Sequence, residues 1–215
     1  MEKIKKGYEK NVSKERMTKE EMEKAISNIT LSPNIEDIKD CDLIIEAATE
    51  NPKIKKSIFA ELDEVCQEKT ILASNTSSLS ITDIGQATKR PEKVIGMHFF
   101  NPVPVMKLVE VISGQKTDAK VKETIINLAK EIGKTPVEVE EAPGFVVNRI
   151  LIPMINEAIG IYAEGVASKE DIDTAMKLGA NHPMGPLELG DLVGLDIVLA
   201  IMEVLYSEFA DPKYR

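Results

Sequence analysis

The residues of this 215-residue chain that are best suited to proton transfer are His98, one of only two histidines, and Glu110. His98 directly follows the apolar run 94–97, and Glu110 lies within a second strand-like run, 107–112. If a turn over 101–105 sets the two runs side by side, the carboxylate reaches the imidazole. It then fixes the tautomer and leaves the other ring nitrogen as a base near neutral pH. The competing interpretations are a loop histidine satisfied by a backbone hydrogen bond and a solvent-facing glutamate on an edge strand.

Small polar residues at two other places are suited to hold a substrate oxygen. Ser77 belongs to a polar loop, 74–78, and Asn148 lies just inside the first turn of a helical segment. The competing interpretation is structural, because turns and helix starts use the same residue types. The second histidine, His182, has two prolines beside it, and we interpret it as a structural loop residue.

The elements that must position these residues follow from apolar periodicity. Short continuous apolar runs suit parallel strands buried on both faces, and here they alternate with segments of helical length. Strands are expected at 43–46, 70–73, 94–97, 107–112 and 136–139, with helices at 51–66, 80–88 and 119–132. Beyond residue 143 the pattern is helical, at 145–165, 169–178 and 187–209, the last interrupted near Gly190 or Gly194. We therefore predict an α/β fold in which a doubly wound sheet precedes an all-α domain.

Helix starts carry recognisable capping signals. A charged, helix-like stretch covers residues 1–28, and Thr18 with Glu21 fits a capping box inside it. The helix at 51–66 is opened by Pro52, which favours the first turn.

Composition excludes several classes of function. The net charge of −9 argues against nucleic-acid binding, which usually requires a basic face. No apolar run reaches the roughly 20 residues of a membrane span, and the charged N-terminal stretch does not resemble a signal peptide. Two cysteines, Cys41 and Cys66, are more simply free thiols of a cytoplasmic protein than a disulfide.

Three long motifs in the same order resemble the L-3-hydroxyacyl-CoA dehydrogenase family, and within it most closely the bacterial 3-hydroxybutyryl-CoA dehydrogenases. They are Ser-Asn-Thr-Ser-Ser-Leu at 74–79, the run from His98 to Glu110, and Pro-Gly-Phe-Val-Val-Asn-Arg at 143–149. The resemblance extends over essentially the whole chain. It implies a Rossmann-type dinucleotide-binding domain over 1–142 and a helical substrate and dimerisation domain over 143–215.

The resemblance also implies a reaction and roles. The family oxidises a 3-hydroxyacyl thioester, here (S)-3-hydroxybutyryl-CoA to acetoacetyl-CoA, and the chain is expected to act as a homodimer on an acyl-CoA substrate. His98 would be the general base and Glu110 would orient it. Ser77 and Asn148 would hold the substrate oxygens as catalytic and substrate-binding residues. Asn101 would help order the loop around His98 and bind substrate.

The cofactor implied by the resemblance is NAD, with NADP as the alternative. Five residues are expected along it: Ala47, Glu50, Lys55, Asn75 and Ser77.

The sequence departs from the family at both ends. The family opens with a strand, a Gly-x-Gly-x-x-Gly turn and a helix that bind the pyrophosphate, whereas Gly7 is the only glycine here before Gly85. We therefore expect a partial Rossmann-type sheet whose first βαβ unit is missing, and a helical domain that is incomplete at its C-terminal end. A remnant strand at 29–32 would lack its neighbour, and the strand at 43–46 would be a bare apolar edge that pairs with another chain or marks a truncated piece.

Two rival interpretations remain open. One is a catalytically inactive fragment of the same enzyme, acting only as a dimeric helical or acyl-CoA-binding module. The other is a hydroxyacid dehydrogenase that uses a catalytic lysine, and the His98–Glu110 pair argues against it.

Overall fold

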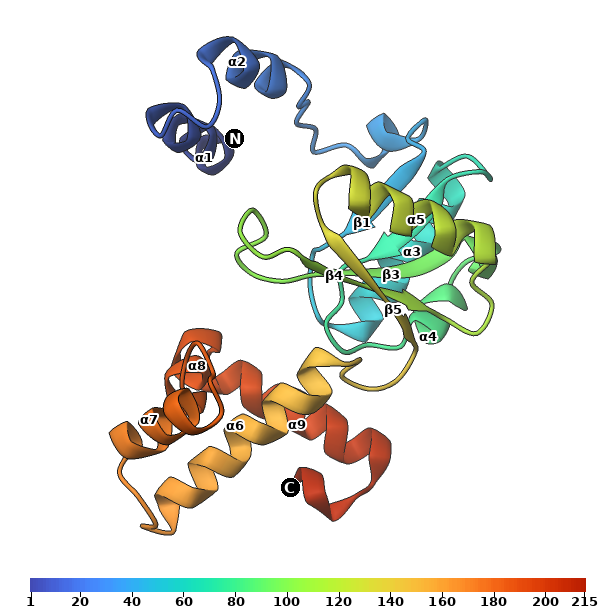
Figure 1. Ribbon diagram of the computed structural model, residues 1–215. Coiled ribbons are helices and arrows are strands. Elements are labelled where there is room, and N and C mark those ends of the chain that lie inside the picture. Colours follow the sequence, from blue (N-terminus) through green and yellow to red (C-terminus); the bar gives the residue numbers. More distant parts are fainter. The chain divides into compact units, whose positions relative to one another are not determined.

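The computed structural model describes residues 1–215, which divide into two compact units, Met1–Lys39 and Asp40–Arg215 (Figure 1). The first unit contains helices α1 (Glu2–Ser13) and α2 (Lys19–Ser27) and the 3₁₀ helix η1 (Ile35–Ile38). The predicted capping box is present at α2: the Thr18 hydroxyl accepts from Glu21 N, and Glu21 Oε2 accepts from Thr18 N.

The second unit begins with one five-stranded sheet in the order β1-β2-β3-β4-β5. The strands are β1 (Leu43–Glu46), β2 (Ile71–Ser74), β3 (Val94–Phe99), β4 (Leu108–Ser113) and β5 (Thr135–Glu140). β1, β2 and β3 run parallel, β4 is antiparallel to β3, and β5 is parallel to β4. All five strands lie where apolar runs predict them.

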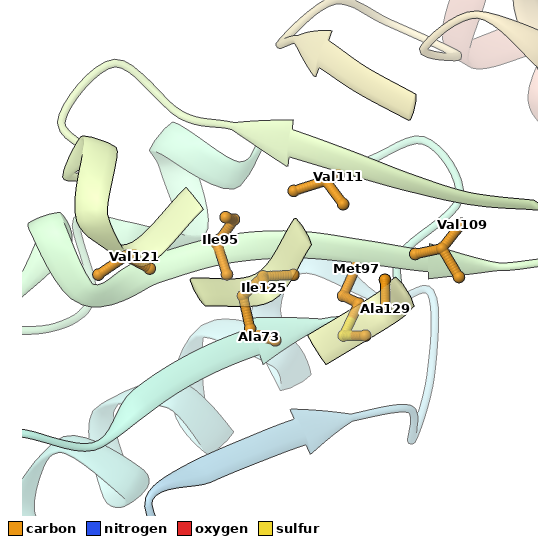
Figure 2. Close-up of a cluster of buried hydrophobic side chains, with 8 residues drawn as sticks. All are labelled: Ala73, Ile95, Met97, Val109, Val111, Val121, Ile125 and Ala129. Atoms are coloured by element: carbon orange, nitrogen blue, oxygen red, sulfur yellow. The ribbon is translucent and has the colours of Figure 1, made fainter. Parts of the chain in front are cut away.

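One face of the sheet is covered by α5 (Ala119–Glu131). Its apolar side chains pack against alternate residues of the central strands, as Figure 2 shows. The buried cluster contains Ala73, Ile95, Met97, Val109, Val111, Val121, Ile125 and Ala129. Side chains alternate across a strand, so His98 and Glu110 project to the opposite face. The face of the sheet that carries the candidate site is therefore fixed by the core on the other side.

Two further helices, α3 (Pro52–Val65) and α4 (Ile81–Gly85), connect the parallel strands. Asn51 caps α3 by accepting from Lys53 N and Ile54 N, and Ser80 caps α4 by accepting from Asp83 N. The 3₁₀ helix η2 (Pro91–Lys93) leads into β3.

The remainder is helical, as predicted, with α6 (Val147–Ala163), α7 (Lys169–Gly179), α8 (Pro186–Val193), α9 (Leu195–Phe209) and the 3₁₀ helix η3 (Pro212–Tyr214). These helices pack together, orange to red in Figure 1, around a core that includes Ile152, Ile155, Val198 and Leu205. The long apolar segment breaks at Gly194, where φ is +101°. None of the helices has the length and apolarity needed to cross a membrane.

Two expectations about local structure need correction. Residues 29–32 form no strand, because a strand is stabilised by hydrogen bonds to a neighbour and none lies beside them; Leu31 is 66% exposed. The helix expected from residue 145 begins at Val147, because Gly144 and Phe145 take the left-handed conformation and delay it. β1 is an edge strand, as expected, and Ile45 on it is 41% exposed.

Candidate active site

His98 and Glu110 form a buried pair across two neighbouring strands. The antiparallel register places them directly opposite each other, and His98 Nδ1 lies 2.9 Å from Glu110 Oε2. They are 6% and 1% exposed. β4 lies between β3 and β5, so the interpretation of Glu110 as a solvent-facing residue on an edge strand is wrong. This geometry suits a neutral imidazole that donates from Nδ1 to a carboxylate, an arrangement that leaves the lone pair at Nε2.

The second oxygen of Glu110 receives the start of helix α6. Glu110 Oε1 accepts hydrogen bonds from Val146 N at 3.1 Å and from Val147 N at 3.0 Å. Amides at a helix N-terminus lack partners within the helix, and the helix dipole favours negative charge there. These contacts satisfy a buried carboxylate and attach the helical part of the unit to the His98–Glu110 pair.

Aromatic side chains flank the His98 ring. Its centroid lies 4.5 Å from that of Phe100 and 5.9 Å from that of Phe145, with interplanar angles of 47° and 56°. Glu110 contacts Nδ1 only, and no group of the chain forms a hydrogen bond with Nε2. The imidazole is therefore held at one nitrogen and flanked by two aromatic rings, while Nε2 stays available to a ligand.

Ser77 and Asn148 meet at the same place, although they are far apart in the sequence. Asn148 Nδ2 donates to Ser77 O at 3.2 Å, and Ser77 N donates to Glu50 Oε1 at 2.6 Å. The Ser77 hydroxyl makes no hydrogen bond within the chain. The structure thus brings the Asn148 side chain against the Ser77 backbone, and it leaves the Ser77 hydroxyl and the second N–H of the Asn148 amide without a partner in the chain.

Asn101 is not brought into this cluster. It is exposed, and no hydrogen bond joins it to the other candidate residues. The exposed loop that follows it is held by Lys134, whose Nζ donates to Met106 O at 2.8 Å and to Val103 O.

The residues expected along a cofactor lie at the carboxyl ends of β1 and β2. Asn75 joins neighbouring strand ends, because its N donates to Glu46 O and its Oδ1 accepts from Phe99 N, both at 2.8 Å. Glu50 Oε2 accepts from Thr76 Oγ1 at 2.7 Å. Ala47 is exposed beside them. In open α/β sheets, ligands bind in the crevice beyond these strand ends.

Lys55 takes part in a network that sequence reasoning missed. Its Nζ lies 2.6 Å from Glu46 Oε2, with side chains 2% and 3% exposed. The Glu46 carboxylate also accepts from Ala48 N at 2.6 Å and from Ser74 Oγ at 3.0 Å. The Lys55 ammonium is therefore engaged by Glu46 and acts on the loop after β1 through it. A charged residue ending an apolar strand was the available signal, because burial requires a partner.

The ionisation of Glu46 reflects this network. Burial on its own raises the pKa of Glu46, but the hydrogen bonds from Lys55 and from Ala48 N outweigh it. The net pKa of Glu46 lies below its ordinary value. The carboxylate stays charged at neutral pH and keeps the backbone after β1 fixed.

A groove of about 610 Å³ is formed by the starts of α3 and α4, the segment 141–145 and the end of α9. Its lining includes Glu50, Ser78, Glu141, Phe145 and Glu208.

The second histidine, His182, lies in the loop between α7 and α8, and its backbone N donates to Met176 O at 3.2 Å. Its interpretation as a loop residue is confirmed.

Comparison with known proteins gives matches along the whole chain. Residues 1–142 match the family profile described as 3-hydroxyacyl-CoA dehydrogenase, NAD binding domain, and residues 144–215 match the profile of the C-terminal domain. A 3-hydroxybutyryl-CoA dehydrogenase of Clostridioides difficile is 66% identical over 209 residues, which are 97% of this chain and 74% of the relative. The human mitochondrial hydroxyacyl-coenzyme A dehydrogenase is 49% identical over 211 residues, 94% of this chain and 67% of the relative.

Solved structures agree with the sequence relatives. The crystal structure of an (S)-3-hydroxybutyryl-CoA dehydrogenase from Ralstonia eutropha superposes with a TM-score of 0.95 at 51% identity. The match covers 98% of this chain and 74% of the other.

Proposed function

The chain belongs to the 3-hydroxyacyl-CoA dehydrogenase family, and we propose that it interconverts (S)-3-hydroxybutyryl-CoA and acetoacetyl-CoA with NAD. In this proposal His98 is the general acid and base. The observation that carries it is the buried His98–Glu110 pair, whose Nδ1 is fixed and whose Nε2 is open. That arrangement provides a single base for one alcohol proton.

The proton is handled by His98. In the oxidative direction, Nε2 accepts the proton of the 3-hydroxyl group, and the Glu110 carboxylate beside Nδ1 balances the charge of the resulting imidazolium. Bound NAD supplies the acceptor for the hydride that leaves C3 of the substrate. In the reductive direction the imidazolium returns the proton to the oxygen of the ketone. One base and one hydride acceptor therefore account for the reaction.

The substrate oxygens need donors that are already in place. The Ser77 hydroxyl is unused, and Asn148 Nδ2 has a second N–H besides the one it donates to Ser77 O, so both are assigned to donating to the reacting carbonyl and its neighbour. Positioning of this kind is worth more than the individual hydrogen bonds, because a fixed geometry lowers the entropic part of the barrier. Asn101 lies in the exposed loop after His98, and its proposed role is to bind substrate.

The donor set at the carboxyl ends of β1 and β2 fits part of a nicotinamide dinucleotide. Ala47 offers a small exposed surface for a planar ring, and Glu50, Asn75 and Ser77 offer oxygen and amide groups. Lys55 supports the same loop through Glu46. We assign no residue of this sequence to the pyrophosphate of the dinucleotide, since the Gly-x-Gly-x-x-Gly turn that usually binds it is not in the sequence. The match to an NAD-binding profile favours NAD over NADP.

The wider organisation is part of the same proposal. The profile matches support a dinucleotide-binding domain over residues 1–142 and a helical domain over 143–215. A homodimer is supported by exposed apolar side chains on the helical part, among them Ile150, Leu178 and Leu192, at 68%, 82% and 70% exposure. A cytoplasmic location stays a prediction.

The test is oxidation of NADH by this chain in the presence of acetoacetyl-CoA. We expect His98→Ala to lower turnover by about 10² to 10⁴-fold, the usual contribution of a positioned acid or base. The matched control is His182→Ala, which removes the other imidazole and leaves turnover unchanged. Equal turnover in His98→Ala and the parent contradicts the proton-transfer role. No turnover in the parent, with acetoacetyl-CoA still bound in calorimetry, supports an acyl-CoA-binding module instead.

A further inference from the structure

The backbone immediately before α6 is strained at a buried aromatic residue. Gly144 has φ +74° and Phe145 has φ +51°. Glycine adopts such values readily, whereas the left-handed conformation is unfavourable for a bulky side chain. The other non-glycine residues with positive φ are Glu15, Asn181 and Ala210, which are all exposed, whereas Phe145 is only 3% exposed. Strain at a buried position persists only where the surrounding structure enforces it, and such positions cluster at functional sites.

This conformation determines where the first turn of α6 points. Phe145 N donates to Ala142 O at 3.0 Å, and the next two amides, of Val146 and Val147, are the ones that Glu110 Oε1 accepts. A right-handed Phe145 would start the helix earlier and turn these amides away from Glu110. The strained residue is thus adjacent to the contacts that hold the partner of His98.

The same backbone conformation places the Phe145 ring against His98. The ring centroids are 5.9 Å apart at 56°, a tilted arrangement within the favourable range for aromatic pairs. Phe100 packs against the imidazole as well, at 4.5 Å. Glu110 binds only one nitrogen, so the imidazole keeps some torsional freedom about its Cα–Cβ and Cβ–Cγ bonds unless neighbouring groups restrict it. The two phenyl rings supply this restriction.

We propose that Phe145 is a positioning residue for His98: its ring fixes the plane of the imidazole, and its left-handed backbone puts the ring there. The residue does not exchange protons, and it acts through His98 and Glu110. Its kinetic consequence rests on the proposed function, but its effect on the imidazole does not. The helical part of the unit therefore contributes to the geometry of a base that lies on the sheet.

The test observes the imidazole directly. In a His182→Gln background His98 is the only histidine, so its ring signals in ¹H–¹⁵N and ¹H–¹³C NMR spectra are assigned without ambiguity. We expect one set of signals with Nδ1 protonated in this background. Phe145→Leu should add a second, exchanging set of His98 signals, beyond the shift that loss of the neighbouring ring causes by itself. The matched control is Phe59→Leu, which removes a fully buried ring from α3 and should leave the His98 signals unchanged.

Kinetics provide the second measurement. If the parent turns over acetoacetyl-CoA, Phe145→Leu should lower kcat by about ten- to a hundredfold, the usual effect of a misplaced catalytic group, with KM within about twofold. Phe59→Leu should change neither constant by more than about twofold. Should Phe145→Leu fail to fold by circular dichroism, Phe145→Met, which fills the same space with a flexible chain, replaces it.

The outcomes separate this inference from the proposed function. A single set of His98 signals in folded Phe145→Leu, displaced only by the loss of the neighbouring ring, overturns the positioning role, whatever the turnover. A second, exchanging set of His98 signals together with an inactive parent supports the positioning role and counts against the reaction. Equal loss of kcat in Phe145→Leu and Phe59→Leu overturns the proposal, because it shows a general effect of losing a core ring.

Discussion

Replacing Lys55 by methionine should destabilise the protein more than any ordinary surface lysine substitution. Lys55 and Glu46 are 2.6 Å apart with side chains 2% and 3% exposed, so the substitution leaves a buried carboxylate with only Ala48 N and Ser74 Oγ as donors. Removing one partner of a buried ion pair costs about 3–5 kcal/mol, which corresponds to a fall in Tm of roughly 6–20 °C for a protein of this size. Chemical denaturation followed by circular dichroism measures the loss of unfolding free energy, and thermal unfolding measures the fall in Tm.

The control and the coupling sharpen this prediction. Lys53→Met changes an exposed lysine of the same helix and should shift the unfolding free energy by no more than about 0.5 kcal/mol. The double variant Glu46→Gln/Lys55→Met should be less destabilised than the sum of the two single variants, because it leaves no buried charge. Additive effects within about 0.5 kcal/mol would refute the reasoning, since they would mean that the two groups do not interact.

The Glu46–Lys55 pair also predicts how the unfolding free energy depends on pH. The pKa of Glu46 is lowered in the folded state, so the folded protein binds this proton less tightly than the unfolded chain does. Its contribution to stability is therefore present above the unfolded pKa, roughly 4.3, and is lost as the pH falls through the lower folded value. The difference in unfolding free energy between the parent and Lys55→Met should shrink with acidification below about pH 4. A difference that grows in acid would contradict the assignment.

Two further substitutions remove buried charged side chains that form hydrogen bonds at the end of a helix, Asp173 at the start of α8 and Arg90 near the end of α3. Asp173→Ala should cost about 2 kcal/mol in denaturant unfolding, because this buried carboxylate accepts from Leu187 N at 2.8 Å and Glu188 N at 3.0 Å at the start of α8. Arg90→Met should lower the unfolding free energy by about 3 kcal/mol, because Arg90 Nε lies 2.6 Å from buried Asp63 Oδ1 and its Nη2 caps Asp63 O. Its thermal unfolding midpoint, compared with that of Lys53→Met, checks the second expectation.

Much of the fold was predictable because local and tertiary preferences agree. Apolar runs located all five strands, and Thr18 with Glu21 marked a helix start whose capping box is present. The cross-strand pairing of His98 with Glu110 was also predictable, because a carboxylate within an apolar strand needs a partner and the histidine lies on the strand before it.

Other features depended on contacts that are distant in the sequence. Residues 29–32 have strand-like composition but no neighbour, and composition alone cannot supply one. The late start of α6 depends on the positive φ of Phe145, a residue type for which sequence gives no reason to expect it. The Glu46–Lys55 pair joins a strand end to the next helix, and a chain of helical residues does not reveal which lysine turns inward.

The residues of the candidate site meet at the start of α6. The first turn of α6 supplies two amides to Glu110, the side chain of Asn148 to Ser77 O, and a neighbouring ring to His98. The residues that meet there are separated by 36 to 71 positions along the chain. Helix ends open more easily than helix centres, because fewer hydrogen bonds hold them. Substitutions that loosen this turn should therefore reduce catalytic turnover at temperatures where the sheet and the rest of the helical core are still folded.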